Sequence, residues 1–437
     1  MTHSLRSRLR GLLALSPIAV FLLVYLAASI AAADFYKMPL SVAFIVAAIW
    51  AMATMPRSLS IAERIDTFSR GAANTNVLYM IWIFILAGAF SALASGTGAV
   101  AATVDMMLAV VPQQWVLPGL FLTACFISMS IGTSVGTIVA LAPIACEFAA
   151  DTGITTPLAV SVVLGGSFFG DNLSFISDTT IAATRSLGVK MNDKFKTNLW
   201  IAVPAALIAL AIYVVLGIDN VNAAYEATSS ASWLLVAPYL IVILLALTGV
   251  NVTLVLLAGI ASCLAIAFAT LSTTVVDMCA MMGDGIAGMS DLIIVTLLAA
   301  GLLEVISRNG GIDCIINWLT HRINGPRGAQ ASLAFLVSLV NVCTANNTIA
   351  IITVGKISSD IADRFRLDRR KAASILDTCS CIVQSALPYG AQTLLAAGLA
   401  KVAPVAFLPY LYYPAALALM TVVAIAFNYP RRYRKAA

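Results

Sequence analysis

The chain has 437 residues, of which 61% are hydrophobic and only 10% are charged, whereas about 25% charged residues is usual in a soluble domain. Its mean hydropathy of +0.98 extends over the whole length, which excludes a soluble enzyme with one tether, a secreted disulfide scaffold and a disordered chain. The net charge of +5 comes from Lys and Arg residues that lie between apolar runs, so no nucleic-acid partner is expected. The composition predicts an integral protein of a lipid bilayer.

Apolar runs long enough to cross a bilayer recur along the chain, since a spanning helix needs about 20 such residues. Two further regions, 114–185 and 328–400, are also apolar but are interrupted by Gly, Ser, Thr, Asn and a few carboxylates. The runs predicted to span the membrane are 11–33, 39–55, 77–97, 198–217, 233–248, 251–270, 290–307 and 404–427.

Basic residues orient these spans, because cytoplasmic loops carry an excess of Lys and Arg. Arg6, Arg8 and Arg10 place the amino terminus in the cytoplasm. The basic residues of 185–196, Lys194 among them, and those of 356–371 are cytoplasmic only if 114–150 and 328–356 return to the side they left. Both segments are therefore predicted to be re-entrant hairpins, and both termini are expected on the cytoplasmic side of the cytoplasmic membrane.

Each half of the chain then has five crossings and one hairpin, and an odd number of crossings inverts the second half relative to the first. This plan is typical of secondary transporters. The sequence thus predicts an all-α polytopic membrane protein with an inverted-topology repeat of about ten transmembrane helices, two re-entrant hairpins and two broken helices. The expected units are a first repeat, 1–217, an external linker, 218–232, and a second repeat, 233–437.

Polar breaks in the apolar regions mark the candidate site, because non-helical backbone at membrane depth must be buried or line a wet cavity. The hairpins break at 132–137 and 344–348, and the spans that follow them break within 165–180 and 377–393. Asp171 and Asp178 are seven residues apart, so they point the same way if this part is helical. Two open alternatives are that the hairpin residues merely cap a bend and that Asp178 pairs with Arg185.

Carboxylates inside a membrane segment mark ion paths by default, and oxygen groups with opened backbone carbonyls suit Na⁺. Because a buried carboxyl group also binds protons readily, competition between Na⁺ and H⁺ for one site is the simplest exchange mechanism. The eight Cys and two His residues contain no CxxC or Cys/His cluster, so no resident cofactor is expected. Without such residues or a nucleophile motif, enzymatic activity is not expected either.

The run from Gly170 to Thr180 resembles the signature of NhaC-type sodium/proton antiporters, in which a Gly-Asp-x-x-Ser-x-x-Ser-Asp-Thr-Thr pattern recurs. Asp377-Thr378, followed by Pro388-Tyr389, is similar to a second segment of that family. The resemblance implies the inverted-repeat scaffold, a homodimer and exchange of Na⁺ for H⁺. Asn172, Phe175 and Gly390 depart from the pattern, so coupled transport of an amino acid or a small carboxylate stays open as an alternative.

The first half is expected to supply the ion-binding carboxylates and most of the neutral oxygen ligands, and the second half to complete the site. The expected Na⁺ ligands are Asp171 and Asp178. The full set of expected ion- or substrate-binding residues is Asp171, Asn172, Ser174, Ser177, Asp178, Thr179, Thr180, Thr133, Thr137, Thr344, Asn347, Asp377 and Thr378.

Overall fold

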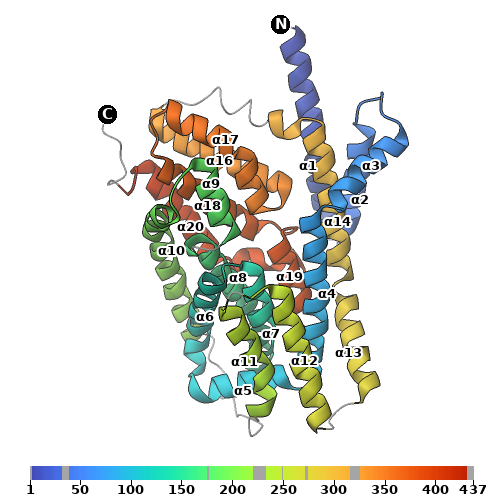
Figure 1. The fold of residues 1–437 in the computed structure, drawn as a ribbon, viewed down its shortest axis with the longest axis vertical. Helices are drawn as coiled ribbons and strands as arrows, with labels where there is room; N and C mark the ends of the chain where they lie inside the picture. Colours follow the sequence, from blue (N-terminus) through green and yellow to red (C-terminus); the bar gives the residue numbers. More distant parts are fainter. Residues whose placement is uncertain are drawn as a thin grey trace.

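The structure is a computed structural model, and it describes residues 2–31, 39–174, 177–219, 233–248, 250–270, 274–314 and 325–430. Within these ranges every regular element is a helix (Figure 1). The predicted all-α class is therefore confirmed. The expected linker, 218–232, falls almost wholly outside the described residues.

The first half begins with helices that pack side by side and ends with a hairpin, a broken span and a long helix. These elements are α1 (Thr2–Ala31), α2 (Leu40–Ala53), α3 (Ile61–Ala72), α4 (Thr75–Gly96), α5 (Ala99–Val110), η1 (Gln113–Trp115), α6 (Val116–Ile131), α7 (Ser134–Thr152), α8 (Thr156–Leu173), α9 (Asp178–Leu187) and α10 (Met191–Asp219).

The second half repeats this order of elements. Its helices are α11 (Trp233–Leu247), α12 (Val252–Thr270), α13 (Val275–Gly288), α14 (Ser290–Arg308), α16 (Gly325–Thr344), α17 (Asn347–Arg364), α18 (Arg369–Ala386), α19 (Ala391–Ala400), η2 (Pro404–Tyr410) and α20 (Tyr412–Ala426).

Three helices lie outside the predicted spans, namely α3, α5 and α13. The search for apolar runs misses them because each is short and is interrupted by at least one charged residue, such as Glu63, Asp105 and Asp277. Local capping nevertheless starts α3, where Ser60 and Glu63 form a capping box, and α13, where Thr274 and Asp277 form the same motif. Each box satisfies backbone N–H groups that the first helical turn leaves without partners.

The two halves share backbone detail as well as element order. Helices α8 and α18 both have 18 residues, and α9 and α19 both have 10. Left-handed backbone conformations also recur 213 positions apart, at Gly132 and Ala345, at Gly153 and Arg366, and at Gly188 and Lys401. Such conformations are uncommon in residues other than glycine, so their recurrence shows a shared chain path.

Counterpart elements lie at opposite ends of the molecule, so the repeat is inverted. In Figure 1, α3, α16 and α17 lie in the upper part, whereas their counterparts α13, α6 and α7 lie in the lower part. Helix α4 packs against α12 and α13, while α14 packs against α2 and α3. Gly88 of α4 meets the backbone of Gly285 in α13, and the counterpart contact brings Gly301 of α14 against Gly71 in α3. The predicted inverted repeat is confirmed.

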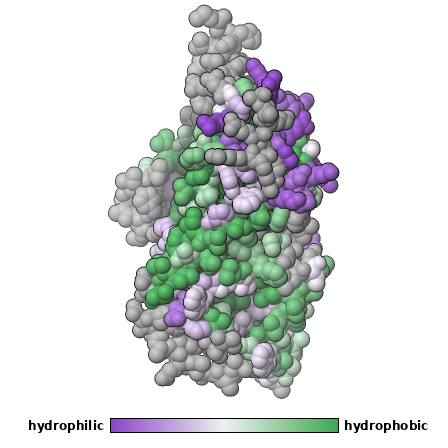
Figure 2. Space-filling model, turned by 90° about the vertical axis from the view of Figure 1, so that its left-hand side faces the viewer, coloured by the Kyte–Doolittle hydropathy of each residue, from purple (hydrophilic) through white to green (hydrophobic). Residues whose placement is uncertain are grey.

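The outer surface suits a bilayer. Six helices among the described residues are long and apolar enough to cross a membrane, or seven if the bent pair 369–400 and 404–410 is one span. Five further helices, α1, α2, α6, α11 and α20, have shorter apolar stretches of 10–17 residues. Figure 2 shows a broad hydrophobic belt across the middle of one face and hydrophilic residues gathered toward its upper end.

Candidate functional site

Both predicted hairpins form, and their tips have the same backbone shape. Helices α6 and α7 meet at Gly132-Thr133, and α16 and α17 meet at Ala345-Asn346. Thr133 has φ −142° and ψ 125°, and Asn346 has φ −147° and ψ 112°. Both residues are extended, so each tip exposes backbone groups that no helix pairs internally.

The predicted broken spans are also present. Helix α8 ends at Leu173 and α9 begins at Asp178, while α18 ends at Ala386 and α19 begins at Ala391. The residues that cap these ends, Ser174 with ψ 141° and Leu387 with ψ 117°, are extended. Each break therefore opens main-chain carbonyls at the end of its first helix.

Each hairpin tip lies against the break of the span that follows it. In the first half, Ser128 Oγ donates a 2.6 Å hydrogen bond to the carbonyl of Ser167, and in the second half Asn341 Nδ2 donates a 2.8 Å bond to the carbonyl of Ser380. Gly170 makes the first contact possible, because a Cβ there would collide with Ser128. Glycine has no side chain, and it commonly lets membrane helices approach each other closely.

Asp171 lies where the first tip meets the first break. Its side chain is buried and its Oδ1 accepts a 3.1 Å hydrogen bond from the backbone N–H of Ser134. Its main-chain carbonyl accepts from the hydroxyls of Ser177, at 2.9 Å, and Thr179, at 3.2 Å. The ion pairs of the described residues do not include Asp171. Asp171 is thus a buried carboxyl group among neutral polar groups.

Asp377, the acid of the second broken span, has a different environment. Its Oδ2 forms a 2.7 Å ion pair with Lys194 Nζ, and the two side chains are 0% and 1% exposed. Asn198 Nδ2 donates a 2.7 Å hydrogen bond to the same oxygen. Lys194 was expected in a cytoplasmic loop with its basic neighbours, and the structure corrects this, because α10 begins at Met191 and carries Lys194 inward.

A chain of hydrogen bonds joins the two halves beside Asp171. Gln392 Nε2 donates to Ser134 Oγ at 3.1 Å, and Gln392 Oε1 accepts from Gln384 Nε2 at 2.9 Å. Gln384 Nε2 also donates to the carbonyl of Ala345, at the second hairpin tip, at 3.0 Å. The first tip, the second break and the second tip therefore share one polar network.

The structure places Asp178 apart from Asp171. The helix is broken between Asp171 and Asp178, so the two carboxylates do not share a helix face, and the side chain of Asp178 is exposed. No ion pair joins Asp178 to Arg185 in the described part of the chain. Asp178 instead begins α9, where a negative charge suits the helix dipole.

The other expected residues of the first half fall in or beside this region. Asn172 and Ser174 are buried at the end of α8, and Asn172 Nδ2 donates to the carbonyl of Phe168 at 2.9 Å. Thr180 Oγ1 accepts from Lys194 Nζ at 2.7 Å. Thr137 Oγ1 donates to the carbonyl of Thr133 at 3.2 Å, within the hairpin itself.

The expected residues of the second half mostly form hydrogen bonds with backbone groups close to them in the sequence. Thr344 Oγ1 donates to the carbonyl of Asn346 at 3.1 Å, and Asn347 Oδ1 accepts from the N–H of Thr348 at 3.0 Å. Thr378 Oγ1 donates to the carbonyl of Ser374 at 2.8 Å. These three side chains support the tip and α18, which leaves Asp377 as the charged contribution of this half.

Five residues of these contacts were missed as site residues, namely Lys194, Asn198, Ser134, Gln384 and Gln392. Lys194 and Asn198 are four residues apart at the start of an apolar run, which places them on one helix face, and this spacing was the available signal. Gln392 gave no signal of its own, because only the folded chain brings it to Ser134.

The fold and the site together define a secondary transporter, with an inverted repeat, paired hairpins and broken helices around buried carboxyl groups. The sequence profile of the Na⁺/H⁺ antiporter family matches residues 9–218 and 221–429. The chain belongs to the Na⁺/H⁺ antiporter family. This membership confirms the NhaC-type resemblance and the transporter class.

Three curated relatives are similar over most of the chain. A malate-2H⁺/Na⁺-lactate antiporter of Bacillus subtilis is 23% identical over 68% of this chain and 71% of its own length. The Na⁺/H⁺ antiporter NhaC of Alkalihalophilus pseudofirmus is 23% identical, covering 80% and 81%. The arginine/ornithine antiporter ArcD of Halobacterium salinarum is 22% identical, covering 85% and 83%.

Among solved structures, the YdaH transporter of Alcanivorax borkumensis aligns with a TM-score of 0.42 and 12% identity. The alignment covers 82% of this chain and 88% of that one.

Proposed function

We propose that this chain exchanges Na⁺ for H⁺, with Asp171 as the group that holds either the Na⁺ or the proton. The observation that carries this proposal is the contrast between the two buried acids. Asp377 is neutralised by Lys194 at 2.7 Å, whereas the Asp171 carboxyl group accepts its hydrogen bond from the neutral Ser134. A buried carboxylate without a cation needs one or needs a proton.

The surroundings of Asp171 fit a hard monovalent cation. The hydroxyls of Ser177 and Thr179 and the tip around Ser134 are oxygen-bearing groups at an opened helix end. Such ends coordinate Na⁺ in transporters built from broken helices. Because Na⁺ and H⁺ would occupy the same carboxyl group, binding one would release the other, and this competition would couple the two fluxes. No resident cofactor is needed for it.

The membrane setting of this proposal is the cytoplasmic membrane, with both termini in the cytoplasm. Arg364 and Arg370 lie where α17 ends and α18 begins, and they support this orientation because cytoplasmic ends are rich in Lys and Arg. We also propose that the chain forms a homodimer, and this part rests on the family resemblance alone. The molecular mass of the detergent-solubilised protein tests it.

The test is ²²Na⁺ uptake into proteoliposomes under an imposed pH gradient. We expect Asp171→Asn to abolish gradient-driven uptake, because an amide neither takes up a proton nor carries a negative charge. Asp178→Asn is the matched control, since Asp178 is also an acid of this motif but is exposed, and it should retain most of the uptake.

Two results would contradict the proposal. Uptake that survives Asp171→Asn but fails in Asp178→Asn would move the exchange site to the start of α9. A folded wild-type chain that moves no Na⁺ but exchanges an amino acid or a small carboxylate would favour the alternative cargo, which the names of two relatives suggest.

A further inference from the structure

Lys194 has an unusual set of partners for a lysine in an ion pair. Its Nζ lies 2.7 Å from Asp377 Oδ2, 2.8 Å from the main-chain carbonyl of Asn172 and 2.7 Å from Thr180 Oγ1. An ammonium group has three N–H donors, and each of these three oxygens can take one. We call these three oxygens the Lys194 site.

The three oxygens are the kinds of ligand that a hard cation takes at a broken helix. The carbonyl of Asn172 belongs to the open end of α8, and Thr180 lies in the first turn of α9. Unwound carbonyls beside a carboxylate coordinate Na⁺ in such folds. The ammonium therefore occupies a place whose oxygens would also suit a metal cation.

Three residues at or beside the Lys194 site each carry a further oxygen that accepts no hydrogen bond in the described part of the chain. These oxygens are Asp377 Oδ1, Asn172 Oδ1 and Asn198 Oδ1, and all three are buried. The ammonium cannot serve them, because its three donors are already used, and buried polar atoms normally have partners. A metal cation has no fixed donor directions, so it can bind oxygens of these side chains that the ammonium group leaves without a hydrogen bond.

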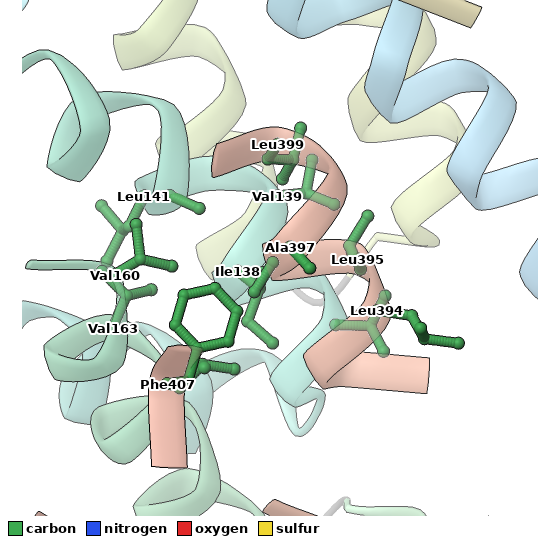
Figure 3. Close-up of a cluster of buried hydrophobic side chains, with 14 of the residues drawn as sticks. Ile138, Val139, Leu141, Val160, Val163, Leu394, Leu395, Ala397, Leu399 and Phe407 are labelled. Carbon is green, nitrogen blue, oxygen red and sulfur yellow. The ribbon is translucent and has the colours of Figure 1, made fainter. Parts of the chain in front are cut away.

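The inverted repeat shows that packing alone does not require this ion pair. The residues 213 positions from Lys194 and Asp377 are Phe407 and Leu164, and both are fully buried. Figure 3 shows Phe407 within an apolar cluster that includes Val163 and Ile138. The matching place in the other half, where α8 packs on η2, is thus filled by apolar side chains, so the charges of Lys194 and Asp377 have another reason.

We propose that the Lys194 ammonium is a built-in cation that fills a second Na⁺ site, so that each chain binds one Na⁺ rather than two. This inference rests on the proposed function, in which the one Na⁺ binds at Asp171. It predicts that truncating Lys194, which leaves the oxygens in place and vacates the space, creates a second site for Na⁺.

The test is equilibrium binding of ²²Na⁺ to the purified, detergent-solubilised chain. We expect the number of Na⁺ ions per chain to be one in the wild type and two in Lys194→Ala. The double variant Lys194→Ala/Asp377→Asn, which lacks the carboxylate, should return to one. Lys194→Met, which fills the space without a charge, should also bind one.

The gain in Lys194→Ala is what decides the inference. A folded Lys194→Ala chain that binds the same number of Na⁺ ions as the wild type overturns it. A variant that stays unfolded in concentrated NaCl overturns it too, because Na⁺ is then unable to replace the ammonium. Failure of the proposed function looks different, since the wild type would then bind no Na⁺ while Lys194→Ala would still gain one ion over it.

Discussion

The side-chain amide of Gln392, in the second half, donates a 3.1 Å hydrogen bond to Ser134 Oγ at the hairpin tip of the first half. Ser134 in turn donates its backbone N–H to Asp171. The group proposed to bind Na⁺ is therefore linked to the opposite repeat through one side chain and one backbone amide. Because the oxygen of the same Gln392 amide accepts a hydrogen bond from Gln384, a movement of either broken span changes the surroundings of Asp171.

We predict that Gln392→Ala slows Na⁺/H⁺ exchange at least several-fold. The substitution leaves Ser134 Oγ and Gln384 Nε2 short of a partner, and a lost buried hydrogen bond costs about 1–3 kcal/mol. Initial rates of ²²Na⁺ uptake measure the effect. Gln330→Ala is the matched control, because Gln330 is also buried and hydrogen-bonded, to Asn428, but belongs to another region. Equal losses of rate in the two variants would show a general loss of stability instead.

The Lys194–Asp377 pair yields a second prediction, measured as stability in Na⁺-free buffer. Lys194→Met and Asp377→Asn should each destabilise the chain by about 3–5 kcal/mol, because either leaves one buried charge without its partner. The double variant Lys194→Met/Asp377→Leu should recover most of that loss, because the matching positions of the other half hold the buried apolar residues Phe407 and Leu164. Unfolding curves in detergent give the comparison, and additive losses in the double variant would contradict a direct pair.

Glycine contacts between α4 and α13 give a third prediction. A Cβ on Gly285 would collide with the backbone of Gly88, whereas a Cβ on Gly283 would meet nothing within 4 Å. Overpacking of this kind costs about 1–3 kcal/mol, while replacing a helical glycine by alanine in open space gains roughly 0.5–1 kcal/mol. Gly285→Ala should therefore lower the thermal midpoint and Gly283→Ala should not. The reverse order would show that α13 does not pack on α4.

Helix α3 should loosen in acid. The backbone N–H and the hydroxyl of Ser60 bind the Glu63 carboxylate, and these hydrogen bonds lower the pKa of Glu63 below its usual value of 4.5. A lowered pKa in the folded state means that the stabilisation is present above the unfolded pKa and is lost as the pH falls through the folded one. Amide exchange of α3 should accelerate below about pH 4 relative to neighbouring helices, and Glu63→Gln should remove the pH dependence.

Much of the fold was predictable because the bilayer constrains it so strongly. A spanning segment must be apolar and must satisfy its own backbone hydrogen bonds, so the runs of 77–97 and 290–307 predicted α4 and α14 within a few residues. The same rule marked the hairpin tips and the broken spans, since polar breaks in apolar regions have few other causes. Glu304 and Arg308 are four residues apart, a spacing that predicts a helical ion pair, and they form one at 3.6 Å.

The candidate site was only partly predictable, because side chains from distant segments decide its charges. The motif pointed to Asp171 correctly as a buried acid at a break, but it also suggested that Asp178 faces the same way, which requires a continuous helix. The break between them turns Asp178 outward. Lys194 was predicted to lie in a cytoplasmic loop, by the rule that basic residues gather there. That rule fails where a buried carboxylate can bind the ammonium group.

Hydropathy and charge along the chain are enough to predict the membrane class, the inverted repeat and the two pairs of interrupted segments, because both act locally. Which carboxylate has a cation, and which does not, depends on how the helices pack. Asp377 and Lys194 come from different halves, and their 2.7 Å contact exists only when α10 and α18 pack together. Electrostatic neutralisation at membrane depth depends on distances of a few ångströms between such segments, and these distances are a property of the folded chain.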